Sequence, residues 1–162
     1  MTMHDLPADG QQAIDFAKSE FVKGSIFWPR LLVRCLEASR PGKTLVVVLD
    51  LYMRKCDQER DVAGKSWCDE LRDVLASREL KDANRVRVRA SEIWNDTRCR
   101  TLLCRGVTRL FGAAASIFEN DFVEYEIELT RAIGMLTASD GVRFGVNEFT
   151  IILQAFQDEF EK

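Results

Sequence analysis

The positions of the prolines constrain the fold of this chain more than any other feature. Of its 162 residues only three are prolines, Pro7, Pro29 and Pro41, so residues 42–162 contain none. Proline removes a backbone donor and breaks helices, and most of the chain is therefore free to form long ones. With 46% apolar and 30% charged residues, the composition is that of a folded chain rather than a disordered one. The length predicts a single domain over residues 1–162.

Apolar side chains recur at helical spacing along much of the chain. The spacing predicts a helix over 8–23 and another that begins after Ser66 as its N-cap. From Ser91 onward the helical stripe is strongest, with a break at 120–121 and a last helix capped by Asn147. We therefore expect a predominantly all-α fold, a compact bundle of six or seven helices with room for one short strand pair.

Two stretches also fit strands. Residues 45–49 form a continuous apolar run, and residues 85–89 alternate arginine with valine. The alternative fold is therefore α/β, with these two stretches as neighbouring strands. Asp50 follows the first run directly, which makes it either a desolvated functional carboxylate or a structural one. The structural role would be a helix N-cap or a buried pair with Arg54 one helical turn later, and we favour it.

The sequence lacks the residues of most familiar catalytic sites. His4 is the single histidine, and it lies near the N-terminus, where we expect the chain to fray. We therefore expect neither a Ser-His-Asp triad nor a histidine-rich zinc site. The segment before Pro7 has no signal-peptide pattern, and the longest apolar run, 45–53, is too short to span a membrane. Five scattered cysteines without a C-x-x-C pair are typical of reduced, buried thiols in the cytosol: Cys35, Cys56, Cys68, Cys99 and Cys104. We expect a soluble cytoplasmic protein without catalytic residues, cofactors or bound metal.

An arginine-rich segment is the clearest non-random feature. Seven arginines lie between residues 85 and 109, and five acidic residues follow between 119 and 128. The planar guanidinium binds carboxylates and phosphates through two hydrogen bonds, and Trp94 offers a stacking surface. The predicted contact surface consists of Arg85, Arg87, Arg89, Trp94, Arg98, Arg105 and Arg109. The alternative is that these arginines pair with the acidic segment of the same fold or of a second copy.

A segment near the C-terminus carries a family resemblance. Residues 143–153 resemble the R-x-G-G-D-E-F hairpin of the diguanylate cyclase (GGDEF) family, and residues 49–52 are similar to that family's metal-binding strand. Four positions of the hairpin motif match: Arg143, Gly145, Glu148 and Phe149. The second glycine and the acid of the motif are replaced by Val146 and Asn147. The resemblance therefore implies a degenerate, nucleotide-responsive domain rather than a catalyst.

These observations favour a non-enzymatic role. We expect a cytosolic protein–protein interaction module, a regulatory, inhibitory or adaptor protein, that uses the arginine-rich surface. Its partner would be another protein with an acidic surface, or a second copy of the chain. A degenerate GGDEF-like domain is the first alternative. Nucleic-acid binding is the second, and the net charge of −3 weighs against it.

Overall fold

The computed structural model describes residues 10–23, 33–34, 43–77, 79, 81–137, 153–154 and 157–158. Within these residues the chain forms six helices and no strand, which confirms the prediction of a predominantly all-α bundle. The alternative α/β fold is wrong, because residues 45–49 and 85–89 both lie in helices. The helices are α1 (Gly10–Val22), α3 (Lys43–Gln58), α4 (Val62–Ala76), α5 (Ala83–Trp94), α6 (Leu102–Phe118) and α7 (Phe122–Thr137).

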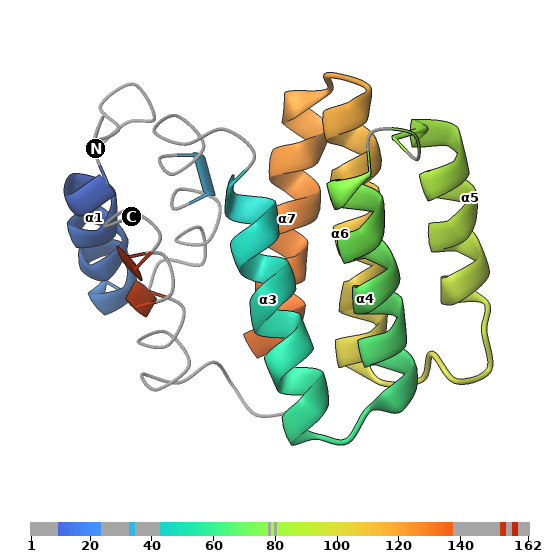
Figure 1. Ribbon diagram of the computed structural model, residues 1–162. Helices are drawn as coiled ribbons and strands as arrows, with labels where there is room; N and C mark the ends of the chain where they lie inside the picture. The colour runs from blue at the N-terminus through green and yellow to red at the C-terminus, as the bar shows by residue number, and fades with distance from the viewer. Residues whose placement is uncertain are drawn as a thin grey trace.

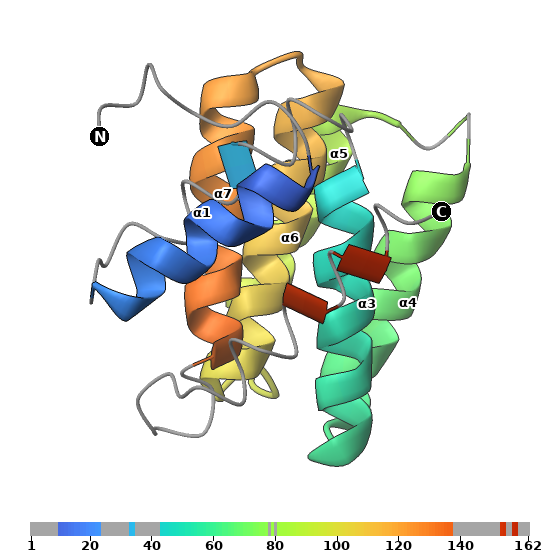
Figure 2. The same ribbon diagram turned by 90° about the vertical axis from the view of Figure 1, so that its left-hand side faces the viewer.

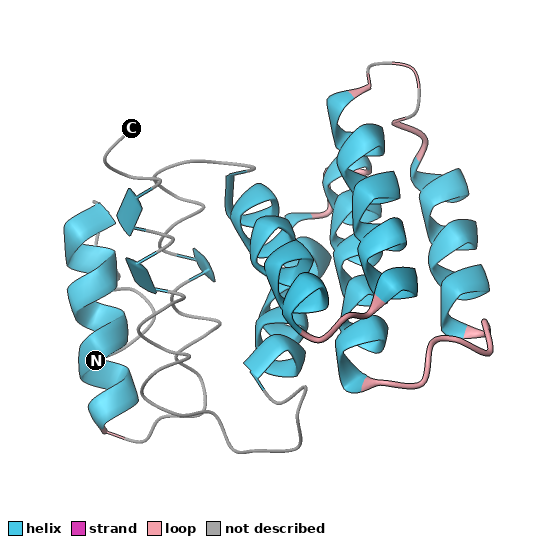
Figure 3. Cartoon of the chain, turned by 60° about the horizontal axis from the view of Figure 1, so that its bottom comes forward, coloured by secondary structure: helices cyan, strands magenta, loops and turns pink. Residues whose placement is uncertain are grey.

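The helices from α3 to α7 alternate in direction around α6 (Figure 1). Among the described helices, α6 packs against α3, α4, α5 and α7, whereas α5 packs closely only against α6. Helix α1 crosses the direction of α3 and α7 at an angle (Figure 2). Helix α5 stands at the opposite edge of the bundle, as Figure 1 and Figure 3 show.

Small residues allow α6 to occupy the centre of this arrangement. Its sequence LLCRGVTRLFGAAASIF contains small residues that are buried in the bundle, namely Gly106, Ala113, Ala114 and Ala115. A Cβ atom on Gly106 would overlap the hydroxyl of Tyr52, a fully buried side chain of α3. That hydroxyl donates a hydrogen bond of 2.5 Å to the carbonyl of Ala132 in α7. Tyr52 therefore crosses α6 at its glycine and connects α3 with α7.

The break predicted at 120–121 is confirmed. Helix α6 ends at Phe118 and α7 begins at Phe122, after Asn120 takes a φ of 59°. The side chain of Asp121 accepts a hydrogen bond of 3.1 Å from the amide of Glu124, which satisfies a free donor in the first turn of α7.

Two helix starts differ from the prediction. Ser66 does not cap α4, because Asp61 accepts from the amide of Gly64 at 2.9 Å and the helix begins at Val62. The stripe from Ser91 is also not continuous, because α5 ends at Trp94 and a new cap, Thr101, begins α6. The last helix predicted after Asn147 lies outside the described residues.

Asp50 is an exposed surface residue rather than a desolvated carboxylate. The apolar run containing it forms a helix, so the buried residues lie on one side and Asp50 on the other. Its carboxylate lies 2.8 Å from the guanidinium of Arg54, and 56% of its side chain is exposed. The pair with Arg54 one turn later is therefore present, but it is exposed, whereas the sequence analysis expected a helix cap or a buried pair.

The hairpin resemblance finds no support in the part of the fold that bears on it. Residues 49–52, which are similar to the metal-binding strand of the GGDEF family, form part of α3. Residues 143–152 lie outside the described part of the chain, and Leu153, the last residue of the motif, is buried.

Candidate interaction surface

Helix α5 distributes the arginines of the central segment over two sides. In a strand, residues 85, 87 and 89 would share one face, whereas in a helix only residues about one turn apart do. Arg85 and Arg89 consequently face α4, and Arg87 lies on the side that faces α7. The N-cap Asp82 fixes the start of this helix by accepting hydrogen bonds from the amides of Asn84 and Arg85.

Each side of α5 borders a groove, because α5 packs closely only against α6. We call the first the α4–α5 groove, a cavity of about 490 Å³ whose lining includes Glu70 and Val74 of α4. We call the second the α5–α7 groove, a cavity of about 330 Å³ whose lining includes Gly112 of α6 and Glu128 of α7. The sequence did not predict either groove, because both arise from contacts that α5 does not make.

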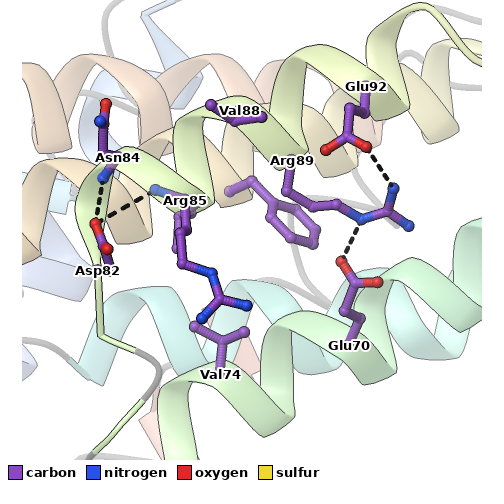
Figure 4. Close-up of a pocket in the computed structure, with 10 residues that line it drawn as sticks. Glu70, Val74, Asp82, Asn84, Arg85, Val88, Arg89 and Glu92 are labelled. Atoms are coloured by element: carbon purple, nitrogen blue, oxygen red, sulfur yellow. Dashed lines mark hydrogen bonds and ion pairs between the residues drawn. The ribbon is translucent and has the colours of Figure 1, made fainter.

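The α4–α5 groove has an apolar base and a charged rim. Phe111 of α6 lies at its base, 1% exposed, and Val74 and Val88 form its walls. At the rim, Arg89 Nε donates to Glu70 Oε2 at 2.7 Å, and its Nη1 lies 3.8 Å from Glu92 (Figure 4). This arginine thereby bridges the carboxylates of Glu70 and Glu92.

Arg85 is the exception among the charged residues of the α4–α5 groove. Its backbone amide donates to the Asp82 cap, but its guanidinium has no hydrogen bond or ion pair within the described part of the chain. Figure 4 shows the guanidinium reaching across the groove toward Val74. The groove therefore presents one unpaired positive charge beside an apolar base.

The α5–α7 groove contains two paired arginines. Arg87 donates to both carboxylate oxygens of Glu119 at 2.9 Å and to the hydroxyl of Ser116 at 3.4 Å. Arg109 of α6 lies deeper, with its Nη1 3.5 Å from Glu128 Oε1. Among the described residues the predicted pairing of arginines with the acidic segment is therefore present at Glu119 and Glu128.

Glu128 is the buried acid of this groove. Its side chain is 9% exposed, and it lies 3.5 Å from Arg109 and 3.7 Å from Arg131. Burial raises the pKa of Glu128, and so does the neighbouring carboxylate of Glu124 through a hydrogen bond and its charge, while the two arginines act in the opposite direction. Gly112 leaves room for this carboxylate, since a Cβ there would lie 2.7 Å from Glu128 Oε2.

Trp94 lies at the end of α5 beside two further arginines. The Cζ atom of Arg105 is 4.4 Å from its ring centre and that of Arg109 is 5.8 Å away, which are distances of cation–π contact. With 38% of Trp94 exposed, the ring remains accessible from the α5–α7 groove.

Arg98 does not join the other predicted contact residues. It lies in the loop between α5 and α6, where its guanidinium donates two hydrogen bonds of 3.0 Å to Asp96. The same interaction lowers the pKa of Asp96 to about 2. Arg98 also covers the ring of the buried Trp67 at 5.3 Å, so its contacts support the loop rather than either groove.

The structure thus gathers Arg85 and Arg89 in one groove, gathers Arg87, Trp94 and Arg109 in the other, and leaves Arg98 apart. The sequence analysis missed Phe111, Val74 and Glu128. The available signal was the composition of α5, ANRVRVRASEIW, which has few large apolar residues with which to pack on several sides. In the structure two of its residues, Val86 and Ile93, are buried.

Comparisons with known proteins yield no relative: no protein family, curated protein or solved structure matches this chain. The fold and the site alone therefore define its class, an antiparallel helical bundle with two grooves beside a peripheral helix. Within the described residues no helix combines the length and apolar character needed to cross a bilayer, and no cluster of three metal-ligating side chains occurs.

Proposed function

We propose that the protein is a protein–protein interaction module that binds an acidic helical segment of a partner in the α4–α5 groove. By occupying that segment it would regulate, inhibit or link its partner. The observation that carries the proposal is the unpaired guanidinium of Arg85 beside the apolar base formed by Phe111.

The shape of the groove favours a helix as its occupant. Helices α4 and α5 lie side by side on α6 without close packing between them, which leaves a channel bordered by two helices. Amphipathic helices commonly bind in such channels through apolar side chains spaced one turn apart. A partner side chain over Phe111 would also cover Val88, which is 57% exposed.

The unpaired guanidinium of Arg85 favours a carboxylate on that helix. Arg89 is shared between Glu70 and Glu92, and the Asp82 carboxylate accepts hydrogen bonds from backbone amides at the start of α5. Arg85 is then the charged group that gains most from a partner, since a carboxylate can accept two hydrogen bonds from one guanidinium. The neighbouring apolar contacts would exclude water and strengthen this pair.

A photo-crosslinking experiment tests the proposal in the cells from which the chain comes. Benzoylphenylalanine in place of Val88 should crosslink one protein in near-stoichiometric yield. The same residue in place of Val62, which is 81% exposed at the start of α4, should not. Equal crosslinking from both positions would contradict the proposal, and an adduct with a second copy would replace it by self-association.

Purified components then test the chemistry of the contact. Arg85→Glu should weaken binding of the crosslinked protein about 100-fold, because it places like charges together in a desolvated site. Arg100→Glu is the matched control, since Arg100 is an exposed loop arginine bonded only to the carbonyl of Thr97 in the described part of the chain. Calorimetric affinities that Arg85→Glu leaves unchanged would rule out the groove as the contact.

A further inference from the structure

We propose that the helix recognised by the α4–α5 groove carries two opposite charges seven residues apart: a carboxylate that meets Arg85 and a basic side chain that meets Glu92. The inference rests on the proposed function and adds to it the sequence pattern of the partner. It follows from an imbalance of charge among the described residues that line the groove. Three carboxylates, Glu70, Asp82 and Glu92, accompany two guanidinium groups, Arg85 and Arg89.

Three of these five charged groups are already engaged within the chain. The Asp82 carboxylate accepts hydrogen bonds from two backbone amides at the start of α5, where the helix dipole is positive. Glu70 and Arg89 form a close ion pair across the groove, with 2.7 Å between Oε2 and Nε. Arg85 and Glu92 are left, one charge of each sign.

Glu92 is the carboxylate that a partner can still neutralise. Its ion pair among the described residues is with Arg89, whose Nη1 lies 3.8 Å away, beyond hydrogen-bond distance. The side chain of Glu92 is 58% exposed, so a lysine or arginine can reach it without displacing a hydrogen bond. Figure 4 shows Arg85 and Glu92 toward opposite ends of the groove, with Val88 and Arg89 between them.

The geometry of α5 determines the spacing of the partner's charges. Arg85 and Glu92 are separated by two helical turns, about 10 Å along the axis. A helix that lies alongside α5 has the same rise per residue, so the charges that meet this pair are also seven residues apart. Val88 lies between the two and is 57% exposed, and an apolar residue one turn from each partner charge would cover it. Because a helix can enter the groove in either direction, the spacing holds for both orders of the two charges.

The two charged contacts should contribute in different ways. Arg85 lies beside the apolar base of the groove, where a paired carboxylate adds affinity. Glu92 lies at the exposed rim, where an ion pair adds little affinity but selects among partners. A uniformly acidic helix would place a carboxylate beside Glu92 and be repelled. Glu92 therefore selects a helix of mixed charge over an entirely acidic one.

Designed helical peptides test this pattern on the full chain. The probe is an alanine-rich peptide with a Glu, a Leu three residues later and a Lys seven residues after the Glu. Fluorescence anisotropy should give a Kd of about 100 µM. A peptide of the same composition with the Lys five residues after the Glu presents the two charges on different sides, and should bind about threefold more weakly. A second Glu in place of the Lys should weaken binding about tenfold, because like charges then meet at Glu92.

Variants of the chain show which residue reads the lysine. Glu92→Gln should weaken the probe about threefold and remove the difference between the two lysine positions, since the two changes then act on one contact. Glu79→Gln is the matched control: this exposed carboxylate lies in the connection between α4 and α5, and its loss should change neither affinity. Arg85→Glu should weaken both peptides about tenfold or more.

The outcomes separate this inference from the proposed function. If Arg85→Glu weakens the probe while the lysine position and Glu92→Gln have no effect, the basic contact is wrong and the acidic contact stands. If Glu79→Gln weakens the probe as much as Glu92→Gln does, the effect is one of net charge, which also overturns the inference. No saturable binding of the probe up to about 2 mM overturns it as well, and crosslinking from Val88 then decides the proposed function independently.

Discussion

Helices α5 and α6 lie side by side but contribute to the protein in opposite ways. Helix α6 buries 11 of its 17 residues and packs against four other helices. Helix α5 buries 2 of its 12 residues and packs closely against α6 alone. The comparison teaches that the central helix needs small apolar residues on several sides, while the peripheral helix can keep charged side chains beside open grooves.

The two helices should also differ in the free energy needed to detach them from the bundle. Two buried apolar residues, Val86 and Ile93, and two exposed ion pairs, Arg87–Glu119 and Arg89–Glu70, attach α5 to the rest of the bundle. Exposed ion pairs contribute only about 0–1 kcal/mol each. Helix α5 should therefore open before α6 does, and binding regions are commonly drawn from such less stable segments.

Truncation of one buried aliphatic residue in each helix gives the largest expected effects. Leu110→Ala in α6 should lower the free energy of unfolding by about 4 kcal/mol, since neighbours on several sides hold the cavity open. Ile93→Ala in α5 should cost about 2–3 kcal/mol, because a peripheral helix can move to fill the space. Urea unfolding measures both values. A larger loss for Ile93→Ala than for Leu110→Ala would invalidate the contrast between the helices.

Much of the central region was predictable from the sequence, and most of α5 was not. The stripe Tyr125, Leu129, Ala132 and Ile133 repeats with the helical period over a length that favours a helix, although residues 123–129 also alternate as a strand would. All four residues are buried. Residues 85–89 fit both periods, because five residues are too few to separate a period of 2 from one of 3.6. The cap at Asp82 decides for the helix, and Val88 is consequently exposed rather than paired in a sheet.

The two grooves could not be predicted from the sequence, for a different reason. A groove here is a missing contact between α4 and α5 or between α5 and α7, and no local pattern encodes a contact that is not made. The arginines were visible, but their partners Glu70 and Glu119 lie 19 and 32 residues away along the chain. Tertiary packing alone determines that Arg89 is paired and that Arg85 is not.

Two glycine-to-alanine substitutions, each of which adds one methyl group, test how tightly α6 is packed at the centre of the bundle. Gly106→Ala should cost about 2–3 kcal/mol, because the new Cβ overlaps the buried Tyr52 side chain and displaces its hydrogen bond to Ala132. Gly134→Ala on α7 is the matched control: a Cβ there meets nothing within 4 Å. That control should stabilise the protein by about 0.5–1 kcal/mol through helix propensity. Thermal unfolding measures the stability of both variants. Equal effects at both positions would mean that the Tyr52 side chain can move to make room for the new Cβ.

Removal of the ion pair across the α4–α5 groove should have a smaller and local effect. Arg89→Met keeps most of the side-chain volume but leaves Glu70 without this partner, and should cost about 0.5–1 kcal/mol. Amide hydrogen exchange should show faster opening in α5, with α6 changed only by the small global loss. Arg72→Met removes an exposed pair within α4 and serves as the control, which should leave α5 exchange unaltered. Equal acceleration in α5 and α6 would show that the two helices open as one unit.

The smallest expected effect is a change in pH dependence at Glu128. Burial raises the pKa of Glu128 in the folded chain above its ordinary value of 4.5. The folded state then binds more protons than the unfolded state, so this group's contribution is full below pH 4.5 and is lost as pH rises through the folded pKa. Glu128→Gln should remove that downward slope from the free energy of unfolding, whereas the exposed Glu79→Gln should not. Denaturant titrations at a series of pH values measure the slope. If the wild-type chain instead gains stability relative to Glu128→Gln as pH rises, then Arg109 and Arg131 outweigh burial, and Glu128 remains charged in the α5–α7 groove.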